Sequence, residues 1–489
     1  MEQNPPQELL SPHYDLNFKK LNMKKIITYL LSILFILSCN EFSDVVDFTE
    51  VINPNLSESS VVGQPNSAMI WRLGIEREIS RTLNEILILA ELGSDNYVNT
   101  QTFFSQFLDN LDIRTTDPDI RDTQNEIARV ARMAEFGLET VGPNDPNYSQ
   151  ELEAEFNFFL GLSKLYAAMY FSMLPEETLG VPVSAESNYN AAIAAFDRAI
   201  SVNAKAEYHL AKARANYYLG NQSEAVSSAT AAINIDPNFI RFAQFDEAEN
   251  PDNTLEDALY ERGTFDDFQP LPSLDFLDPK YSFVSAEEDA PVHYFKAEEA
   301  YLILAEANLA DNNLSAAQQN LNDLLGIVGD RLVRSIDDSG ETRGNQANAV
   351  DDERRPNNSS VIVNGRAGLV LDRDQGMVNI PAISGTSLTA ADISAMTLGD
   401  DALTLLYRTR QEIFIAEGIR FVDMGIKLVI NENEILQNEN INDGDPGTTP
   451  VIPPFIDSVK DILDEITYDQ DNNIATTQLD VNALLVANK

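Results

Sequence analysis

Apolar residues recur every third or fourth position over several long stretches of the chain, which is the spacing of one face of a helix. A helix is predicted from about Asn66 to Gly93, with apolar positions at Ile75, Ile79, Leu83, Ile86 and Ala90. A second is predicted from Asp117, which caps it, to about Val141, where Gly142-Pro143 ends it. The third and most apolar helix is predicted from Leu152 to Leu174.

Residues 206–239 match the tetratricopeptide (TPR) pattern, a repeat of about 34 residues built from two helices and a turn. Ala213 stands where the first helix crosses its neighbour, and Gly220-Asn221 fill the turn. Ala225 and Ala232 lie on the second helix, and Asp236-Pro237 ends it, since proline has no N–H with which to continue a helix. Small side chains at a crossing let two helix backbones approach closely.

Two further stretches repeat part of this pattern. Ala192 and Ala199 stand one unit upstream of Ala225 and Ala232, and Ala317 holds the position of Ala225 in a downstream pair. A helix pair cannot bury its apolar stripe alone, so TPR-like units at about 150–240 and 290–326 predict a stacked scaffold. The alternative is an ordinary helical hairpin with alanines in its seam. A TPR array indicates a binding surface and names no chemistry.

Other regions lack helical periodicity. Residues 241–289 are rich in Asp, Pro and Phe and predict a long loop, and residues 335–389 predict a polar insertion with a hairpin at Asn364-Gly365. Both are candidates to border a binding face. Helix resumes near Ala390 and culminates in Leu405–Leu428. A loop at 431–454, a short helix near 456–466 and a tail complete the chain.

The amino terminus reads as an export signal. Lys24-Lys25 precede an apolar run that ends at Cys39. About a dozen apolar residues are too few to cross a bilayer, which takes ~20, but they suit the core of a signal peptide. Cys39 is the only cysteine, so it forms no internal disulfide, and it stands where a bacterial lipoprotein signal is cleaved and acylated. The alternative is an ordinary buried cysteine at the end of an anchor helix.

These observations divide the chain into four parts. Residues 1–22 are expected to be an upstream extension ahead of a true start at Met23, and residues 23–38 a lipoprotein signal peptide. Residues 39–65 are expected to be the acylated Cys39 and an acidic tether. Residues 66–489 are expected to form a single helical domain.

The charge of the chain excludes several partners. The formal net charge is −45, and cleavage before Cys39 removes four basic and three acidic residues, which leaves −46. A surface this negative repels phosphate backbones and anionic headgroups, which argues against nucleic acid and against electrostatic membrane binding. The membrane attachment would therefore come from the lipid on Cys39.

The sequence offers little that could catalyse a reaction. His209 is expected to pack on a repeat helix and His293 is isolated, and with Cys39 acylated no Cys/His zinc set remains. No nucleophile elbow, Walker or dinucleotide glycine motif occurs. Paired carboxylates, as in glycoside hydrolysis, remain the alternative, but with 78 acidic residues a pair at any spacing is expected by chance. The Asp/Asn-rich loops at 438–445 and 469–473 offer oxygen ligands for Ca²⁺, which remains the alternative, but they lack EF-hand spacing, so no metal or cofactor is predicted.

A late segment resembles the signature of the SusD/RagB family, surface lipoproteins of Bacteroidetes that capture nutrients. It contains, in order, Arg408, Arg410, Glu412, Glu417-Gly418, Arg420, Phe421 and Asp423. Glu91–Asn96 is similar to the family's early helix-ending motif, and Gly180-Val181-Pro182 to its turn before the repeats. The resemblance covers about Cys39 to Leu428. The insertion at 335–389 and the ending at 451–489 depart from the family pattern.

The resemblance implies a mostly α fold, in which a TPR-like scaffold packs against an irregular, loop-rich half. It implies a lipid-anchored protein on the outer surface of the outer membrane, partnered with a TonB-dependent, SusC-like transporter. The protein would bind an oligosaccharide or a peptide and catalyse no reaction. A TPR lipoprotein that organises envelope complexes is the alternative. Because Glu417, Arg420 and Asp423 lie three apart, an ion-pair ladder on one helix face is predicted rather than ligand contacts.

Sugar recognition needs flat aromatic faces with amides and carboxylates at a cleft rim. The single Trp71 sits in the middle of a predicted helix and is expected in the core, which keeps a peptide ligand open. The candidate ligand contacts are aromatic residues in the first two loops: Tyr97, Phe103, Phe104, Tyr260, Phe265 and Phe268.

Overall fold

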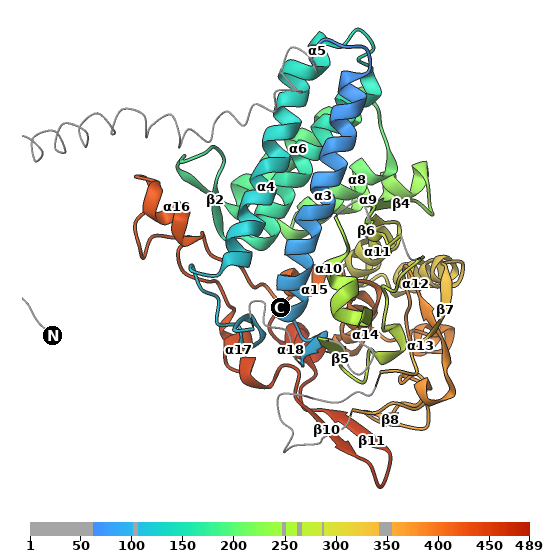
Figure 1. Ribbon diagram of the computed structural model, residues 1–489. Helices are drawn as coiled ribbons and strands as arrows, with labels where there is room; N and C mark the ends of the chain where they lie inside the picture. The colour runs from blue at the N-terminus through green and yellow to red at the C-terminus, as the bar shows by residue number, and fades with distance from the viewer. Residues whose placement is uncertain (1–61, 101–105, 247–250, 262–266, 286–287, 342–354) are drawn as a thin grey trace, which may run out of the picture. The chain divides into compact units, whose positions relative to one another are not determined.

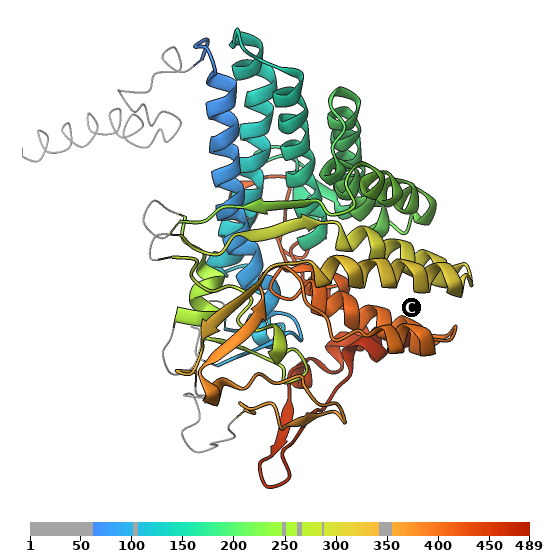
Figure 2. The same ribbon diagram turned by 90° about the vertical axis from the view of Figure 1, so that its right-hand side faces the viewer.

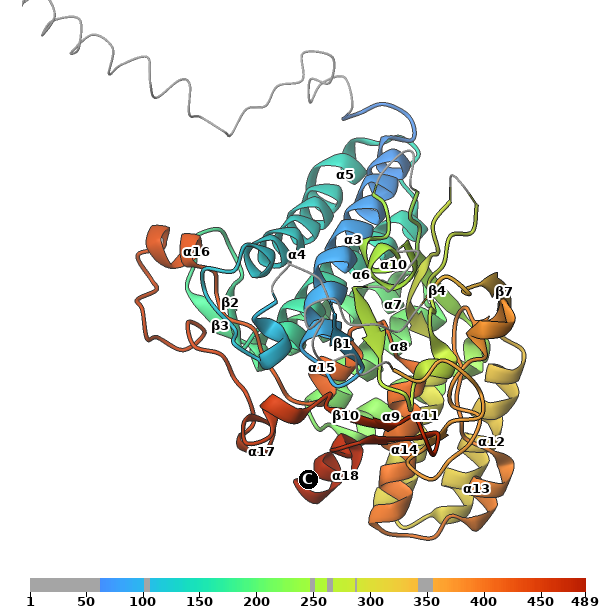
Figure 3. The same cartoon turned by 60° about the horizontal axis from the view of Figure 1, so that its bottom comes forward.

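Three long helices pack side by side near the start of the fold (Figures 1 and 3). The computed structural model describes residues 62–100, 106–246, 251–261, 267–285, 288–341 and 355–489. The three predicted helices are confirmed, and they are α3 (Ser67–Leu92), α4 (Pro118–Phe136) and α6 (Gln150–Tyr170). Asp117 caps α4 as predicted, since its carboxylate accepts the N–H of Asp119 at 2.9 Å.

The ends of α4 and α6 differ from prediction by a few residues. After α4 the chain continues as a π-helical turn, Gly137–Val141, and a short α5 (Gly142–Asn144), so Gly142-Pro143 opens a last helical turn instead of ending the helix. Helix α6 ends at Tyr170, earlier than the predicted Leu174, because the chain enters β2 (Met173–Pro175). This strand pairs antiparallel with β3 (Pro182–Ser184).

Helix pairs follow, as the alanine pattern predicts. Helix α7 (Ala185–Val202) pairs with α6, α8 (Ala206–Tyr218) with α9 (Gln222–Ile235), and α11 (Glu298–Ala310) with α12 (Leu314–Gly329). The alanines at the crossings are buried: Ala192, Ala199, Ala213, Ala225, Ala232 and Ala317. Gly220 has φ 74°, a conformation that favours glycine, in the turn between α8 and α9. Figure 2 shows these pairs stacked above the orange α14 (Asp400–Ile413).

The described part of 241–289 is largely irregular, as predicted, but it also contains short strands and helical turns that the prediction of a long loop does not include. Strand β4 (Ile240–Ala243) pairs with β6 (Val292–Lys296), and β1 (Tyr97–Asn99) pairs with β5 (Phe268–Pro270). Short helical turns lie between them: α10 (Thr254–Glu256), Asp257–Glu261 and Asp275–Leu277. Buried Leu255, Leu259 and Leu277 anchor these turns to the core, which helical periodicity over so few residues could not reveal.

The insertion and the tail share a small sheet. The predicted turn at Asn364-Gly365 is confirmed, with φ 49° and 79°, and Val363 and Arg366 bridge across it. Strand β8 (Ile362–Val363) does not pair with the second predicted run. It pairs in parallel with β11 (Ile474–Thr477), which also pairs with β10 (Ile466–Asp469). The tail is thus part of the fold, and it ends in α18 (Val481–Ala487).

The other late elements are short. Strand β7 (Val333–Asp337) pairs with β9 (Met377–Pro381). The remaining elements are the 3-10 turns Leu108–Asn110, Arg373–Gln375 and Lys460–Ile462, and the helices α13 (Ala390–Ala395), α16 (Glu432–Gln437) and α17 (Pro454–Asp457).

The prediction of one helix over Leu405–Leu428 is wrong. Helix α14 ends at Ile413, and α15 (Ile419–Asp423) begins after a break at 414–418. Ala416 and Gly418 have positive φ values of 61° and 71°, which no α-helix accommodates. The break turns the chain, so side chains before and after it face different parts of the molecule.

One large hydrophobic core joins the helices and the irregular half. It runs from Ala68 to Val486, and the residues from Val62 onward form one compact unit. Within the described residues, no helix combines the length and the apolar character needed to cross a membrane. The predicted fold class, a mostly α protein with a TPR-like scaffold and a loop-rich half, is confirmed.

Candidate functional site

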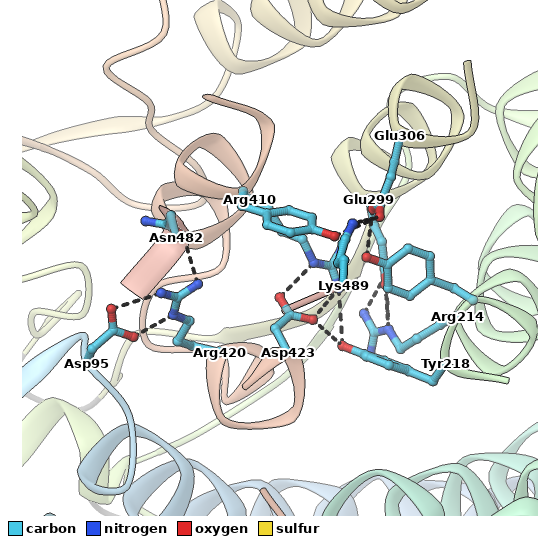
Figure 4. A network of polar contacts seen from close by, with 12 residues as sticks. Asp95, Arg214, Tyr218, Glu299, Glu306, Arg410, Arg420, Asp423, Asn482 and Lys489 are labelled. Atoms are coloured by element: carbon cyan, nitrogen blue, oxygen red, sulfur yellow. Dashed lines mark hydrogen bonds and ion pairs between the residues drawn. The ribbon is translucent and has the colours of Figure 1, made fainter. Parts of the chain in front are cut away.

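A buried ion pair joins the early motif at the end of α3 to the late signature. The Arg420 guanidinium donates to both Asp95 oxygens, at 2.5 Å from Nε and 2.8 Å from Nη2 (Figure 4). Its third nitrogen, Nη1, donates to Asn482 Oδ1 in α18 at 2.9 Å. Asn482 donates in turn to Gln411 of α14 at 2.8 Å. Elements far apart in sequence are therefore held together by one hydrogen-bonded group.

Glu91 supports the start of α15 from the end of α3. Its Oε1 accepts the N–H of Gly418 at 2.7 Å, and its Oε2 accepts Nδ2 of Asn96 at 2.8 Å. Complete burial raises the pKa of Glu91 to about 7, while the hydrogen bonds from Asn96 and Gly418 oppose that rise.

The predicted ion-pair ladder of Glu417, Arg420 and Asp423 does not form. Glu417 lies in the break before α15, and Arg420 and Asp423, which both belong to α15, each pair with another residue. Glu417 accepts from Lys280 and from Lys296, the latter at 2.5 Å. Asp423 instead binds Arg410, with 2.7 Å between Oδ2 and Nε. All three charged groups of the predicted ladder are engaged inside the protein, which agrees with a structural role.

The structure brings the two candidate ligand loops together. Strand β1 places Tyr97 opposite Pro270 of β5, and the rings of Tyr97 and Phe268 lie 6.2 Å apart. Both side chains are 1% exposed, so neither offers a ring face to a ligand, and their prediction as contacts is wrong. They pack the two loops against each other instead.

Of the other candidates only Tyr260 lies in the described part of the chain. It is half-buried, and its ring meets the exposed ring of Phe283 edge-on at 5.9 Å. Phe103, Phe104, Phe265 and the candidate lipid site Cys39 lie outside the described residues.

A hollow of about 590 Å³ lies between α3 and the β4–β6 ribbon, and we call it the rim cleft. Its rim carries the ring of Phe242, which is 45% exposed, and the exposed side chains of Arg77, Gln244 and Glu288. The Gln244 amide and the Glu288 carboxylate make no side-chain hydrogen bond to another described residue. An aromatic face beside an amide, a carboxylate and a guanidinium is the combination that binds sugar hydroxyls and ring C–H faces.

Buried polar contacts fix the walls of the rim cleft. Ser80 of α3 donates to the Gln244 carbonyl at 2.7 Å, and Tyr294 Oη accepts Arg241 Nε at 2.7 Å. The Phe242 ring lies 5.9 Å from the imidazole of His293, tilted by 57°. Burial and then the charge of Lys280 lower the pKa of His293 to about 3, so the imidazole is neutral at physiological pH.

Sequence reasoning missed Phe242 and Gln244, although a local signal exists. In Arg241–Asp246 the exposed Phe242 and Gln244 alternate with the buried Ala243 and Phe245, which is the period of two of a strand with one buried face. This alternation covers only a few residues and directly follows a predicted repeat helix, so it was not recognised as a strand.

A second hollow, the polar cleft, is lined by Asp95 together with residues of α14 and α18. Its volume is about 350 Å³, and the turn at Asn364 and Arg366, from the predicted insertion, forms one wall. Its acidic side chains are already engaged. Glu412 accepts Thr386 Oγ1 at 2.7 Å and the N–H of Ser387 at 2.8 Å, and Asp480 accepts the N–H of Ala483 at 3.0 Å.

A third hollow, the tyrosine cleft, lies between the repeat helices and α15. It measures about 450 Å³, and its polar lining comprises Tyr217, Tyr218, Glu306, Tyr407, Arg410, Arg420, Asp423, Asn488 and Lys489. Arg410 and Asp423 neutralise each other there, and Tyr218 Oη donates to Asp423 at 2.9 Å (Figure 4).

No group of three or more His, Cys, Asp or Glu side chains within the described ranges could hold a metal ion. In the two Asp/Asn-rich loops the carboxylates accept from their own backbone, as Asp445 does from Asn442 at 2.8 Å and Asp469 from Asn472 at 3.1 Å.

Comparison with known proteins gives structural neighbours only. No protein-family model and no curated protein matches the sequence. A SusD-like protein from Bacteroides fragilis superposes with a TM-score of 0.51 at 13% identity, over 77% of this chain and 88% of that one. A SusD superfamily protein from Parabacteroides distasonis gives 0.51 at 11% identity, over 77% and 98%. A candidate sugar-binding protein from Bacteroides vulgatus gives 0.52 at 12% identity, over 78% and 98%. The chain therefore has the fold of the SusD superfamily, as the resemblance in its sequence predicts.

Proposed function

We propose that the chain captures a nutrient, an oligosaccharide or a peptide, at the cell surface and passes it to a TonB-dependent outer-membrane transporter without catalysing a reaction. The observation that carries the binding step is the rim cleft. There Phe242 lies beside Gln244 and Glu288, whose side chains make no hydrogen bond to another described residue. A structurally similar protein is described as a candidate sugar-binding protein, which supports the same class of ligand.

The two walls of the rim cleft are both anchored in the hydrophobic core. A rigid helix, α3, forms one wall and the β4–β6 ribbon the other, and each is anchored in the core by buried side chains such as Ile79 and Phe295. A preformed site loses less conformational entropy on binding than a site that must order first. The rim cleft is thus suited to the capture of a ligand.

Binding of a panel of glycans and peptides, measured by calorimetry, tests the first step. Phe242→Ala removes the aromatic face and should weaken a bound sugar by about tenfold, which corresponds to ~1.4 kcal/mol. Phe107→Ala is the matched control, since its ring is 48% exposed but contacts Arg114 away from the cleft. Equal loss in both variants, or no ligand in the panel, would contradict the assignment of this cleft.

The delivery step and the absence of catalysis need separate tests. Co-purification of a TonB-dependent β-barrel with the membrane-bound protein would support delivery. If other envelope proteins co-purify and no barrel does, the chain is better described as a scaffold lipoprotein. Products released from polysaccharides by the purified protein would contradict a purely binding role.

A further inference from the structure

The tyrosine cleft contains a carboxylate that two tyrosines hold in place. Tyr217 Oη donates to Glu306 Oε2 at 2.7 Å, and Tyr407 Oη donates to Glu306 Oε1 at 2.9 Å. Burial, followed by the charge of Glu306, raises the pKa of the Tyr217 hydroxyl well above its ordinary value, so the hydroxyl keeps its proton and remains a donor. The Glu306 side chain is still 19% exposed to the cleft.

An ammonium group already occupies this position. The Lys489 Nζ lies 2.5 Å from Glu306 Oε1 (Figure 4). It also lies 3.9 Å from the centroid of the Tyr407 ring. A cation within about 6 Å of a ring face is attracted by the ring quadrupole, and a carboxylate beside it adds a charge-assisted hydrogen bond. The two contacts together form a site for a primary ammonium group.

The remaining charges of the cleft do not compete for this position. Arg410 is paired with Asp423, and Arg420 is paired with Asp95. Glu306 is left with Lys489 as its salt-bridge partner among the described residues. Apolar Val422, Phe455 and Leu485 line the same hollow, so they could cover the aliphatic stem of a bound side chain.

We propose that the tyrosine cleft is a binding site for a primary ammonium group on an unbranched aliphatic stem, as in the lysine side chain of a peptide, and that Lys489 fills it from within the same chain. A strongly acidic protein attracts cations, so the charge of the chain favours such a ligand. The site is separate from the rim cleft, and it does not depend on the proposed function.

Displacement of Lys489 requires little rearrangement. Its side chain is 41% exposed, while α18 is held by the buried Val481 and Leu485 and by Asn482. A tethered side chain competes at a high effective concentration, on the order of millimolar, so an external amine binds more weakly while Lys489 is present. Replacement of Lys489 should therefore expose the site without unfolding the protein.

The test uses Nα-acetyl-lysine methylamide as probe and its norleucine analogue, which lacks the ammonium group, as control ligand. NMR titration should show the lysine probe binding Lys489→Met about tenfold more tightly than the unaltered protein. The norleucine analogue should not bind. Adding Glu306→Gln to Lys489→Met should abolish binding of the lysine probe, since the carboxylate is lost.

Lys460→Met is the matched control, because it removes another partly exposed lysine–carboxylate pair, with Asp457, outside the cleft. It should leave the affinity for the probe unchanged. Thermal melting establishes that each variant is folded. A folded Lys489→Met protein that binds neither probe, or binds both equally, would overturn the proposal.

Discussion

At the scale of single residues, the Asp95–Arg420 pair predicts a large loss of stability on mutation. Both side chains are at most 5% exposed, so Asp95→Ala leaves the Arg420 charge buried without its carboxylate. Breaking a buried pair from one side costs about 3–5 kcal/mol. Urea unfolding followed by circular dichroism should show this loss in the free energy of unfolding.

Asp112→Ala provides the comparison for that variant. Asp112 also pairs with an arginine, Arg114, but its side chain is 51% exposed. Exposed pairs contribute about 0–1 kcal/mol, so this variant should unfold almost as the unaltered protein does. Similar losses for Asp95→Ala and Asp112→Ala would show that burial does not set the energy of the first pair.

The raised pKa of Glu91 predicts a pH dependence of stability. The ordinary pKa is 4.5 and the value in the fold is about 7, so between these values the folded carboxyl holds a proton that the unfolded chain has lost. The free energy of unfolding therefore falls as pH rises through this window, by roughly 3 kcal/mol from this group. Glu91→Gln should remove that part of the slope, as urea titrations at about pH 5 and about pH 7.5 would reveal. Parallel pH profiles for the two proteins would contradict the assignment.

The sequence alone does not show which aromatic side chains are buried, so it could not identify those that are free to contact a ligand. The sequence identifies Tyr97 and Phe268 as aromatic residues in loops, but only the pairing of β1 with β5 shows that both rings are covered. The sequence alone does not identify Phe242, because its exposure depends on how β4 pairs with β6, including an irregularity of register between Arg241 and Phe242. Contacts between distant segments decide which aromatic ring reaches solvent.

At the scale of elements, Gly418 allows the break between α14 and α15. Its φ is 71°, and a Cβ there would lie 2.9 Å from Tyr170 Oη and 3.2 Å from Leu87 Cδ2. Gly418→Ala should cost about 2–4 kcal/mol, because ~1–2 kcal/mol of left-handed strain adds to the cost of overpacking. Chemical denaturation measures the difference.

Gly365→Ala separates the two contributions. Gly365 has a φ of 79°, but a Cβ added there would meet nothing within 4 Å. Only the conformational strain of ~1–2 kcal/mol should appear in this variant. If Gly365→Ala is as destabilising as Gly418→Ala, then the contacts with Tyr170 and Leu87 do not matter for the break.

Helices and strands are predictable from the sequence when they are formed by contacts between residues that are close in sequence. The TPR-like helices were predicted correctly because Ala213, Ala225 and Ala232 mark crossings between neighbours in sequence. The break at 414–418 was not predicted, since it depends on Glu91 binding the N–H of Gly418 from α3. The strand pairing of β8 with β11 was missed for the same reason, because more than a hundred residues separate the two strands.

At the scale of the whole molecule, the candidate clefts are assembled from parts that the sequence keeps apart. The rim cleft combines α3 with residues 242–246 and Tyr294, and the tyrosine cleft combines the repeats with the last residues of the chain. Sequence motifs located the scaffold and the charged residues of the late signature, but not the ion pairs that these residues form. The motifs could not locate the clefts, because the residues that line each cleft come from segments far apart in the sequence.

The predicted lipid on Cys39 should provide the protein's attachment to the lipid bilayer. With a net charge of −46 after cleavage before Cys39, the chain is repelled by anionic headgroups, so no electrostatic attraction can replace the lipid. One acyl chain gives only marginal binding, and the two or three chains of an acylated amino-terminal cysteine give stable anchoring. Cys39→Ser should therefore move the protein from the membrane fraction to the soluble fraction, measured by immunoblotting after ultracentrifugation. Ser38→Ala, beside the predicted cleavage point, keeps a small residue there and should leave the protein with the membrane. Retention of Cys39→Ser in the membrane fraction after a high-salt wash would contradict lipid anchoring through this residue.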